Sequence, residues 1–276
     1  LQAGATFADG DVIEAFITDI NSGGTQDDLT NDTLSFTVVS AIGGTYVVGP
    51  SAGADYATVG AAFNDLEAIG ICAPVTLEIE SGNHPTEAEI TGPILGSSAT
   101  NTVTVTSQTG NAADVTLETV TTNPIILMTD VSFFIFEDLT FEDTDFGAGD
   151  ATLFEAEDAV TDLTLQNNVF IGDENLVSTS SINTLVDFND FTGGFENVLL
   201  QDNTFRGGSA GVYFSGSHEG IEVIGNEFVN NHRWGLYLNG PDNSVIRGNV
   251  VTNNTTTATL YQGIYTFSAF GTAVES

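Results

Sequence analysis

The stretch VLLQDNTFRGGSAGVYFSGSHEGIEVIGNEFVNNHRWGLYLNGPDNSVIRGNVVTNN, residues 198–254, decides the fold of this chain because it repeats itself. Three blocks align: VLLQDNTF (198–205), IEVIGNEF (221–228) and SVIRGNVV (244–251), with an Asn at 203, 226 and 249, a step of 23 residues each time. A second apolar run, GVYFSG (211–216) and then GLYLNG (235–240), lies between them. A fixed period of this length, with two short strands and no helix in each repeat, predicts a solenoid of stacked parallel β-coils.

Earlier blocks extend the pattern toward the N-terminus. FIFEDLTF (134–141) and LTLQNNVF (163–170) join the same column, whose positions are spaced by 29, 35, 23 and 23 residues. The longer early steps predict loop insertions at 142–151 and 171–183. The Asn column, which reads Leu139, Asn168, Asn203, Asn226 and Asn249, is expected to adopt the left-handed conformation and to bond the coils above and below through its side-chain amides.

Two apolar columns are expected in the core. The residue three places before each column Asn is always apolar, so we predict that this set points inward: Phe136, Leu165, Leu200, Val223 and Ile246. The second apolar run supplies the other predicted column: Phe154, Val186, Tyr213, Tyr237 and Tyr265.

A helix is predicted ahead of the coils, from Thr58 to Ile69, because its apolar residues form one stripe. Thr58 can cap its start and Gly70 can end it. The order DYATVGAAFNDL followed by PVTLEIESGNHPTEAEI resembles the N-terminal cap of pectin-lyase-like right-handed parallel β-helices, although Asn83-His84-Pro85 departs from that pattern. The resemblance implies that the helix covers the open end of the solenoid, which would otherwise leave strand edges and core exposed.

The predicted domains are residues 1–42, 43–73 and 74–276. The first carries two strand patterns, in 11–20 and 34–42, and its NDTLS motif resembles the Ig-like modules that precede β-helix regions in large secreted bacterial surface proteins. Two or three strands are too few for a complete sandwich, so we expect the C-terminal part of an Ig-like domain. Residues 43–73 are expected to be a Gly-rich linker and the capping helix. The region 74–276 is the predicted β-helix, and it stops in the middle of a coil, so we expect that the chain is truncated at both ends.

Composition restricts the partners of this chain. It has 38 acidic residues and three basic ones, Arg206, Arg233 and Arg247, with a net charge of −35. Such a surface repels nucleic acid, anionic membranes and polyanionic sugars that no divalent cation bridges. No run approaches the roughly 20 apolar residues of a membrane span. The single cysteine, Cys72, forms no intrachain disulfide and is expected to be a buried small hydrophobe.

Enzymes of the pectin-lyase-like class were weighed against these residues. The resemblance implies an Arg or Lys base with calcium-holding acids for lyases, and clustered Asp residues, a Gly-His-Gly turn and an Arg-x-Lys pair for hydrolases. The chain has no lysine, Arg206 and Arg247 do not occupy equivalent coil positions, and GSHEG (216–220) matches the His turn only loosely. Asp187 and Asp190 are the nearest approach to an acid pair, and we expect them to be solvated turn carboxylates.

Other chemically dense spots receive a structural interpretation as well. In His232-Arg233-Trp234 the Trp can stack on a sugar ring, but packing at a coil corner is the favoured alternative. His84 is expected to be exposed in a turn. The acidic turns DTDFGAGD (143–150) and Asp27, Asp28 and Asp32 could hold Ca²⁺, yet we favour solvated acids there.

The sequence therefore predicts an all-β protein: a right-handed parallel β-helix with an N-terminal helix cap, preceded by the C-terminal part of an Ig-like β-sandwich. It predicts a non-catalytic, extracellular or cell-surface role as a stalk, filament or adhesin segment of a giant protein, with no catalytic, cofactor or metal residues. This protein resembles multidomain surface proteins exported by the type IX route. Expected partners are neighbouring domains of the same protein, other copies in a filament, and polysaccharide or cell-surface glycan. The alternative is a carbohydrate-active enzyme or polysaccharide-binding module, and two close carboxylates beside Trp234 or a tyrosine would contradict a purely structural role.

Overall fold

Short runs of alternating apolar and polar residues form the strands of this protein, because one face of each strand packs inward and the other meets solvent. The computed structural model describes residues 10–16, 33–37, 40–121, 124–144, 152–174, 183–189, 194–216, 218–254, 261–267 and 269–275. The chain divides into two units, Leu1–Ile42 and Gly43–Ser276. In the first, β1 (Val12–Phe16) pairs antiparallel with β2 (Thr33–Thr37). The Ig-like identity of that unit stays a prediction.

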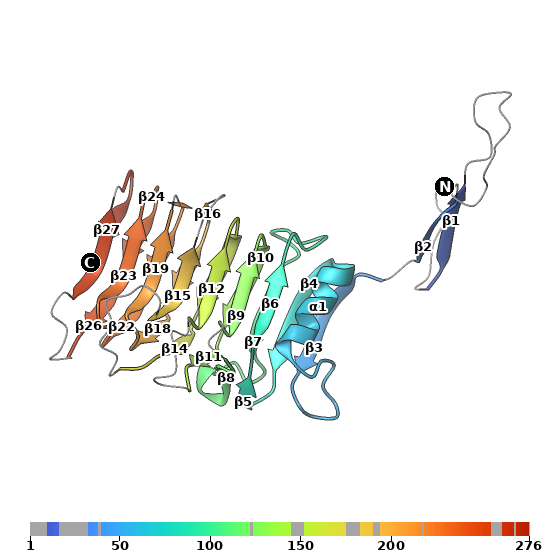
Figure 1. Cartoon of the computed structure of the whole chain (residues 1–276), viewed down its shortest axis with the longest axis horizontal. Coiled ribbons are helices and arrows are strands. Elements are labelled where there is room, and N and C mark those ends of the chain that lie inside the picture. The colour runs from blue at the N-terminus through green and yellow to red at the C-terminus, as the bar shows by residue number, and fades with distance from the viewer. Residues whose placement is uncertain are drawn as a thin grey trace, which may run out of the picture. The chain divides into compact units, whose positions relative to one another are not determined.

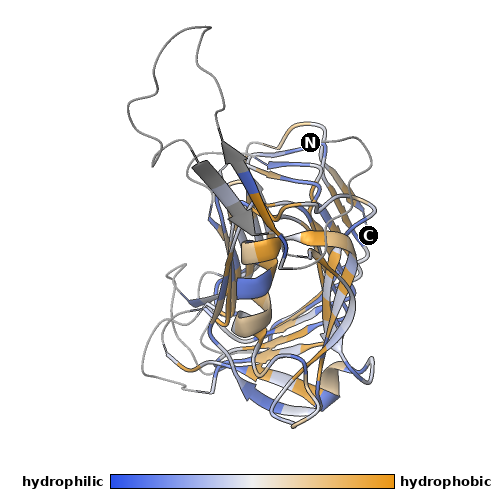
Figure 2. Ribbon diagram, turned by 90° about the vertical axis from the view of Figure 1, so that its right-hand side faces the viewer, coloured by the Kyte–Doolittle hydropathy of each residue, from blue (hydrophilic) through white to orange (hydrophobic). Residues whose placement is uncertain are grey.

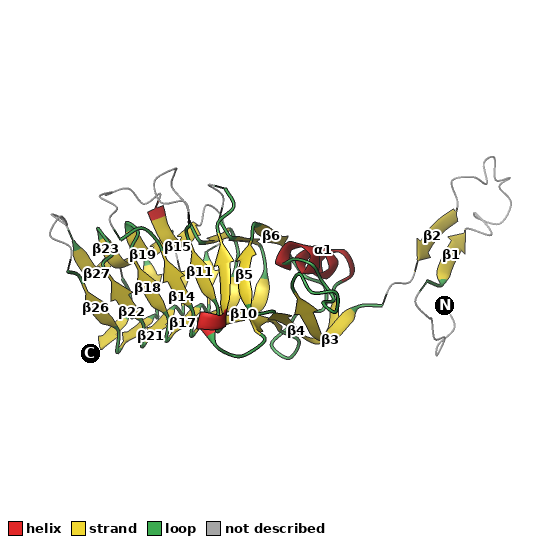
Figure 3. Cartoon of the chain, turned by 90° about the horizontal axis from the view of Figure 1, so that it is seen from below, coloured by secondary structure: helices red, strands yellow, loops and turns green. Residues whose placement is uncertain are grey.

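Three sheets build the second unit (Figures 1 and 3). The first sheet contains β3 (Ile42–Val48), β4 (Ile71–Ile79), β7 (Val103–Ser107), β10 (Ser132–Glu137), β13 (Thr161–Gln166), β17 (Leu199–Gln201), β21 (Glu222–Ile224), β25 (Val245–Arg247) and β28 (Ala273–Glu275), with β16 (Phe195–Glu196), β20 (His218–Glu219) and β24 (Pro241–Asp242) attached. The second sheet contains β5 (Gly82–Pro85), β8 (Val115–Glu118), β11 (Thr140–Glu142), β14 (Val169–Ile171), β18 (Thr204–Arg206), β22 (Glu227–Val229) and β26 (Val250–Thr252). The third sheet contains β6 (Ala88–Thr91), β9 (Ile126–Thr129), β12 (Phe154–Glu157), β15 (Thr184–Asn189), β19 (Ala210–Ser215), β23 (Trp234–Asn239) and β27 (Gln262–Phe267).

The chain visits the three sheets in turn, so that each coil contributes one strand to each sheet. β10, β11 and β12 make one coil, for example, and β13, β14 and β15 stack on it through parallel pairing. Seen along the stack, the three sheets enclose a single interior (Figure 2). The fold is a right-handed parallel β-helix, the hand that crossovers between parallel strands almost always take, and this confirms the fold class expected from the sequence.

The predicted inward column of the first sheet is confirmed in register. Phe136 lies opposite Leu165, Leu165 opposite Leu200, and the series continues through Val223 to Ile246, all of them buried. The second sheet adds a stack of four phenylalanines, Phe141, Phe170, Phe205 and Phe228, whose ring centroids lie 4.7, 5.1 and 5.1 Å apart. Each buried ring contributes roughly 1.5–3 kcal/mol by leaving water, so the core itself holds the coils in register.

The Asn column is a hydrogen-bonded ladder inside the stack. The side-chain oxygen of Asn203 accepts the backbone N–H of Asn168 at 2.9 Å, and that of Asn226 accepts the N–H of Asn203 at 2.9 Å. The amide nitrogen of Asn203 donates to the carbonyl of Leu165 at 2.7 Å, and the one of Asn226 donates to Leu200 at 2.8 Å. Each asparagine therefore reaches back to the preceding coil, which confirms the predicted amide bonding.

The predicted left-handed conformation falls on a different residue. Positive φ occurs at the position just before each column residue: Asp138 (55°), Asn167 (54°), Asp202 (53°), Gly225 (68°) and Gly248 (64°). These residues turn the backbone from the first sheet into the second, and Asn, Asp and Gly are the types that tolerate this conformation. The following Asn is then free to point its amide into the stack.

Helix α1 (Val59–Ile69) covers the N-terminal end of the β-helix (Figures 1 and 2). The hydroxyl of Thr58 accepts the N–H of Ala61 at 3.2 Å, and Gly70, with a φ of 70°, follows the last turn. The buried stripe of α1 includes Phe63, whose ring meets Phe134 of β10 edge-on at 6.3 Å. The expected lid is confirmed.

Two local expectations were wrong. The stretch 43–57 is not only a connection, because β3 joins the edge of the first sheet next to β4. Cys72 is exposed rather than buried, since it lies on the outward face of β4 while Ile71 and Val75 are buried. An apolar neighbourhood in the sequence does not tell which strand face a residue takes.

Candidate functional site

The outer face of the third sheet carries an unbroken row of side chains that the sequence did not place together. Val186 pairs with Val212, and Asp187 pairs with Tyr213, which pairs in turn with Tyr237 and Tyr265. The outward row, running from β12 to β27, is Glu155, Asp187, Tyr213, Tyr237 and Tyr265. We call it the outer row.

The predicted column Phe154, Val186, Tyr213, Tyr237, Tyr265 is therefore wrong by one residue after Val186. A shift of one residue exchanges the two faces of a strand, so the tyrosines point outward and not into the core. The inward partners of Val186 are Val212, Leu236 and Ile264. Aligning LVDF (185–188) with GVYF (211–214) gives this register directly, because the flanking Val and Phe match and Asp187 then falls beside Tyr213.

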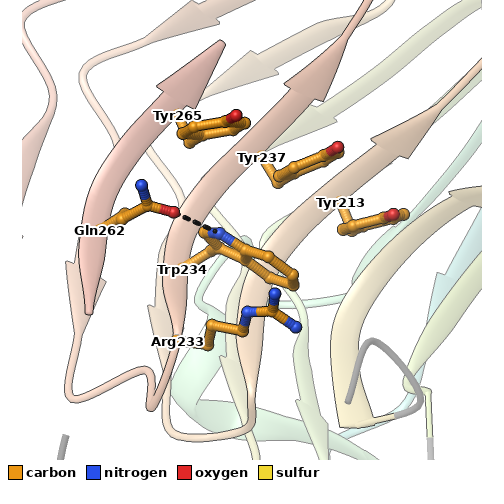
Figure 4. A pocket seen from close by; sticks show the side chains of 6 residues that line it. All are labelled: Tyr213, Arg233, Trp234, Tyr237, Gln262 and Tyr265. Carbon is orange, nitrogen blue, oxygen red and sulfur yellow. Dashed lines mark hydrogen bonds between the residues drawn. The ribbon is translucent and has the colours of Figure 1, made fainter. Parts of the chain in front are cut away.

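Three stacked tyrosines and a tryptophan line a cleft at the C-terminal part of the outer row (Figure 4). The rings of Tyr213 and Tyr237 lie 4.5 Å apart and nearly parallel, and Tyr237 and Tyr265 lie 5.3 Å apart. The cleft has a volume of about 400 Å³, and its lining is completed by Arg233, Trp234 and Gln262. The phenol rings lie in a row with their hydroxyls toward the same side (Figure 4).

Trp234 forms one wall of this cleft without being an open platform. It is the first residue of β23 and only 5% exposed, and its indole N–H donates to the side-chain oxygen of Gln262 at 3.0 Å. The guanidinium carbon of Arg233 lies 3.6 Å from the ring centroid, a cation–π contact. The predicted packing of Trp234 at a coil corner is confirmed, and the cation beside it fixes the edge of the cleft.

The free surfaces of the tyrosine stack determine what the cleft can bind. Both faces of the Tyr237 ring are covered by its neighbours, which leaves its edge and hydroxyl accessible. Toward β15, no ring among the described residues lies against Tyr213, because the next member of the outer row is the short Asp187. Burial raises the pKa of the Tyr213 phenol, and Tyr237 and Asp187 raise it further, so the hydroxyl stays protonated and can donate a hydrogen bond.

Two carboxylates continue the outer row. Asp187 of β15 and Glu155 of β12 occupy paired positions, so their backbones are about 4.8 Å apart. Burial, then the charges of Glu155 and Glu157, raises the pKa of Asp187 to about 7. Burial and Glu157 also raise the pKa of Glu155. One carboxyl oxygen of Asp187, Oδ1, is buried without a hydrogen-bond partner, which is costly unless the group is protonated or a ligand reaches it.

The pair expected from the sequence, Asp187 and Asp190, is replaced by this one. Asp190 lies outside the described residues. Asp187 is not the solvated turn carboxylate that we expected, since it belongs to strand β15 and is largely shielded. The partner across the sheet, Glu155, is 32 positions away in the chain and only the strand register reveals it.

The three arginines do not form one site. Arg206 ends β18 in the second sheet, and its Nε lies 3.8 Å from a carboxylate oxygen of Glu174, with both side chains about half exposed. Arg247 ends β25 in the first sheet and is exposed. Arg233 alone lines the cleft. The expected surface role holds for Arg206 and Arg247.

The histidines also lie apart from the cleft. His232 is 4% exposed, and its backbone N–H donates to the Gly208 carbonyl at 2.9 Å. His218 of GSHEG is buried against Phe195 and Phe214, with ring centroids 5.4 and 5.2 Å away, so it does not form an exposed catalytic turn. His84 is half-buried in β5, with its Nε2 2.6 Å from the carbonyl of Glu80, and not simply exposed as predicted.

The acidic turns give no metal centre among the described residues. No group of three or more His, Cys, Asp or Glu side chains gathers there in a way that could hold a metal ion. Asp143 is buried and accepts the hydroxyl of Thr119 at 3.2 Å, while 145–150 and Asp27, Asp28 and Asp32 lie outside the described residues. In the described ranges, no helix has the length and apolar character to cross a bilayer.

Comparison with known proteins adds similarity at the level of the coil. The profile of a family described as "Periplasmic copper-binding protein (NosD)" matches residues 191–266, which contain the repeat and most of the cleft. No curated protein sequence matches the chain. Among solved structures, the pectin methylesterase from Aspergillus niger in deglycosylated form is 11% identical over 85% of this chain and 87% of its own, with a TM-score of 0.42. A rhamnogalacturonan lyase is 10% identical over 83% of this chain and 62% of its own, with a TM-score of 0.36.

Proposed function

We propose that this protein is a glycan-binding, adhesive segment of a large secreted or envelope-side protein, and that it binds carbohydrate in the cleft beside the tyrosine stack. One observation carries the proposal: three stacked tyrosines, a tryptophan, an amide and a guanidinium line a cleft on an outer sheet face. Aromatic walls with a few polar groups are typical of small-molecule and sugar sites, where ring edges meet C–H groups and hydroxyls meet the polar side chains.

The charge of the chain narrows the ligand to uncharged sugars. Each of the three cations faces a large excess of acids, and the outer row itself continues into Asp187 and Glu155. A polyanionic chain would be repelled along that row, whereas neutral hydroxyls can donate to carboxylates and accept from phenols.

A stalk with no ligand is less well supported. Two carboxylates on neighbouring strands adjoin Tyr213, and this is the arrangement that counts against a purely structural role. Membership of a giant adhesin, filament formation, extracellular location and type IX export remain parts of the proposal, supported by the acidic solenoid and the resemblances in its sequence.

Copper, which the name of the matching family suggests, does not fit the residues of this chain. Copper is held by Cys, Met and His ligands gathered around one point. Met128 is fully buried in β9, Cys72 is exposed on β4, and His84 lies in β5 of another sheet. We therefore derive no role for copper.

The binding test uses the purified chain and immobilised neutral polysaccharides, with Tyr237→Ala and Tyr237→Phe as variants. We expect wild-type protein to be retained, Tyr237→Ala to lose at least about tenfold in affinity, and Tyr237→Phe to lose less because only a hydroxyl is removed. Phe267→Ala is the matched control, since Phe267 is a 54% exposed aromatic on β27 that does not line the cleft. Equal loss in Phe267→Ala, or no retention of the wild type by any carbohydrate, would refute the proposal.

A second candidate function is hydrolysis of a glycosidic bond, which the Asp187–Glu155 pair specifically favours. Asp187, protonated near neutral pH, could give its proton to the leaving glycosidic oxygen, while Glu155 attacks the anomeric carbon or activates a water. Water then completes the cleavage to two free sugar ends. The measurement is release of reducing ends from a bound polysaccharide, which Asp187→Asn and Glu155→Gln should abolish while binding persists. Binding without any release of reducing ends leaves the non-catalytic role.

A further inference from the structure

The outer row extends the cleft lengthwise toward the N-terminal end of the β-helix. Beyond Tyr213 it offers Asp187 and then Glu155, each on the next coil and on the same face. It stops at Leu127 of β9, the apolar residue that pairs with Glu155. The row thus comprises five polar or aromatic side chains on five successive coils.

The spacing of the row matches a linear sugar chain. Neighbouring strands lie about 4.8 Å apart, and the tyrosine rings repeat at 4.5 and 5.3 Å. One pyranose residue in an extended β-1,4-linked chain has about the same length. Such a chain, laid along the axis of the β-helix, would therefore meet an equivalent position on each coil, whereas a curled α-linked chain would leave the row.

A step in height beside Tyr213 provides the place where a sugar ring can stack. The tyrosines cover one another, but the short Asp187 leaves the outer face of the Tyr213 ring without an aromatic partner among the described residues. A ring lying there would be above Asp187, whose buried Oδ1 has no hydrogen-bond partner. A sugar hydroxyl would supply the missing partner of a group that is otherwise costly to leave unsatisfied.

We propose that an uncharged, β-1,4-linked polysaccharide lies along the outer row with one sugar residue per coil, stacked on Tyr213 and hydrogen-bonded to Asp187 and Glu155. This inference rests on the proposed glycan-binding function and adds to it the linkage, the orientation and two polar subsites. The acids also set specificity, because a uronate residue would bring its carboxylate next to Asp187, Glu155 and Glu157.

The test is titration calorimetry of the whole chain with β-1,4-linked gluco-, manno- and xylo-oligosaccharides of two to six residues. For at least one series we expect affinity to rise with each added residue up to five and to level off at six. In the double variant Asp187→Asn, Glu155→Gln the rise should end at three residues, with a loss of about fivefold for each hydrogen bond removed. Glu89→Gln is the matched control: Glu89 has the same register on β6 but lies beyond Leu127, so its loss should leave every affinity unchanged.

The outcomes separate the two proposals. Affinity that levels off at three residues in the wild type, an equal effect of Glu89→Gln, or binding restricted to acidic or α-linked glycans would overturn the lengthwise path and leave the cleft intact as a glycan site. Failure of every carbohydrate to bind would remove the proposed function itself.

Discussion

At the scale of single residues, Asp187 is the group whose environment differs most from what its sequence context suggests. Burial and the neighbouring charges of Glu155 and Glu157 raise its pKa to about 7, and Tyr213 faces it from the adjacent strand. An unfolded chain has its Asp pKa near 3.9. Between about pH 4 and pH 7 the folded protein thus keeps a proton that the unfolded chain has lost.

We expect the free energy of unfolding to fall as pH rises through that window, by roughly 1.4 kcal/mol per unit from this group, and to change no further through it above pH 7. Asp187→Asn removes the effect because an amide resembles the protonated acid. Its melting temperature should match wild type near pH 4 and exceed it at pH 8, measured by differential scanning calorimetry. Glu89→Gln, an equal change of charge at an exposed site, should lack this difference. A variant less stable than wild type at pH 8 would contradict the assignment.

At the scale of elements, the asparagine ladder and the third sheet show how far the sequence predicts the structure. The inward column of the first sheet was predictable because every coil carries the same Asn three residues after an apolar residue, as in Leu200 and Asn203. The outer row was not, because its members change type from coil to coil. Only pairing across 26 or 32 residues brings Tyr213 beside Asp187 and Asp187 beside Glu155, so the candidate site depended on a register that no single residue marks.

Removing one rung tests whether the ladder joins the coils. Asn226→Ala leaves the N–H of Asn203 and the carbonyl of Leu200 without their side-chain partners inside the stack, where each unsatisfied group costs about 1–3 kcal/mol. We expect a loss of roughly 2–4 kcal/mol in the free energy of unfolding from urea titration. Asn64→Ala, on the exposed face of α1, is the control and should change stability by less than about 0.5 kcal/mol. Equal effects of the two substitutions would show that the ladder is incidental.

At the scale of the whole molecule, the dominant property is a net charge of −35 on a chain of 276 residues. A β-helix places this charge on the outside of regular, closely spaced coils, where like charges on neighbouring strands repel each other. The buried columns of phenylalanine and the asparagine ladder must outweigh that repulsion. Salt weakens it, since the Debye length falls from about 30 Å at 0.01 M to about 3 Å at 1 M ionic strength.

Stability should therefore increase with salt. We expect the melting temperature to rise steadily between 0.01 and 1 M NaCl, by several degrees, because screening relieves repulsion in the folded state more than in the expanded unfolded chain. Equimolar sucrose, which strengthens burial without screening charge, controls for a general solute effect and at 0.5 M should raise the melting temperature less than NaCl does. Screening should also be complete near 1 M, so a further increase in NaCl should add little. A melting temperature that is flat or falls over the first 0.5 M of NaCl would mean that the acids are already compensated, by a bound cation or by pairing that the described residues do not provide.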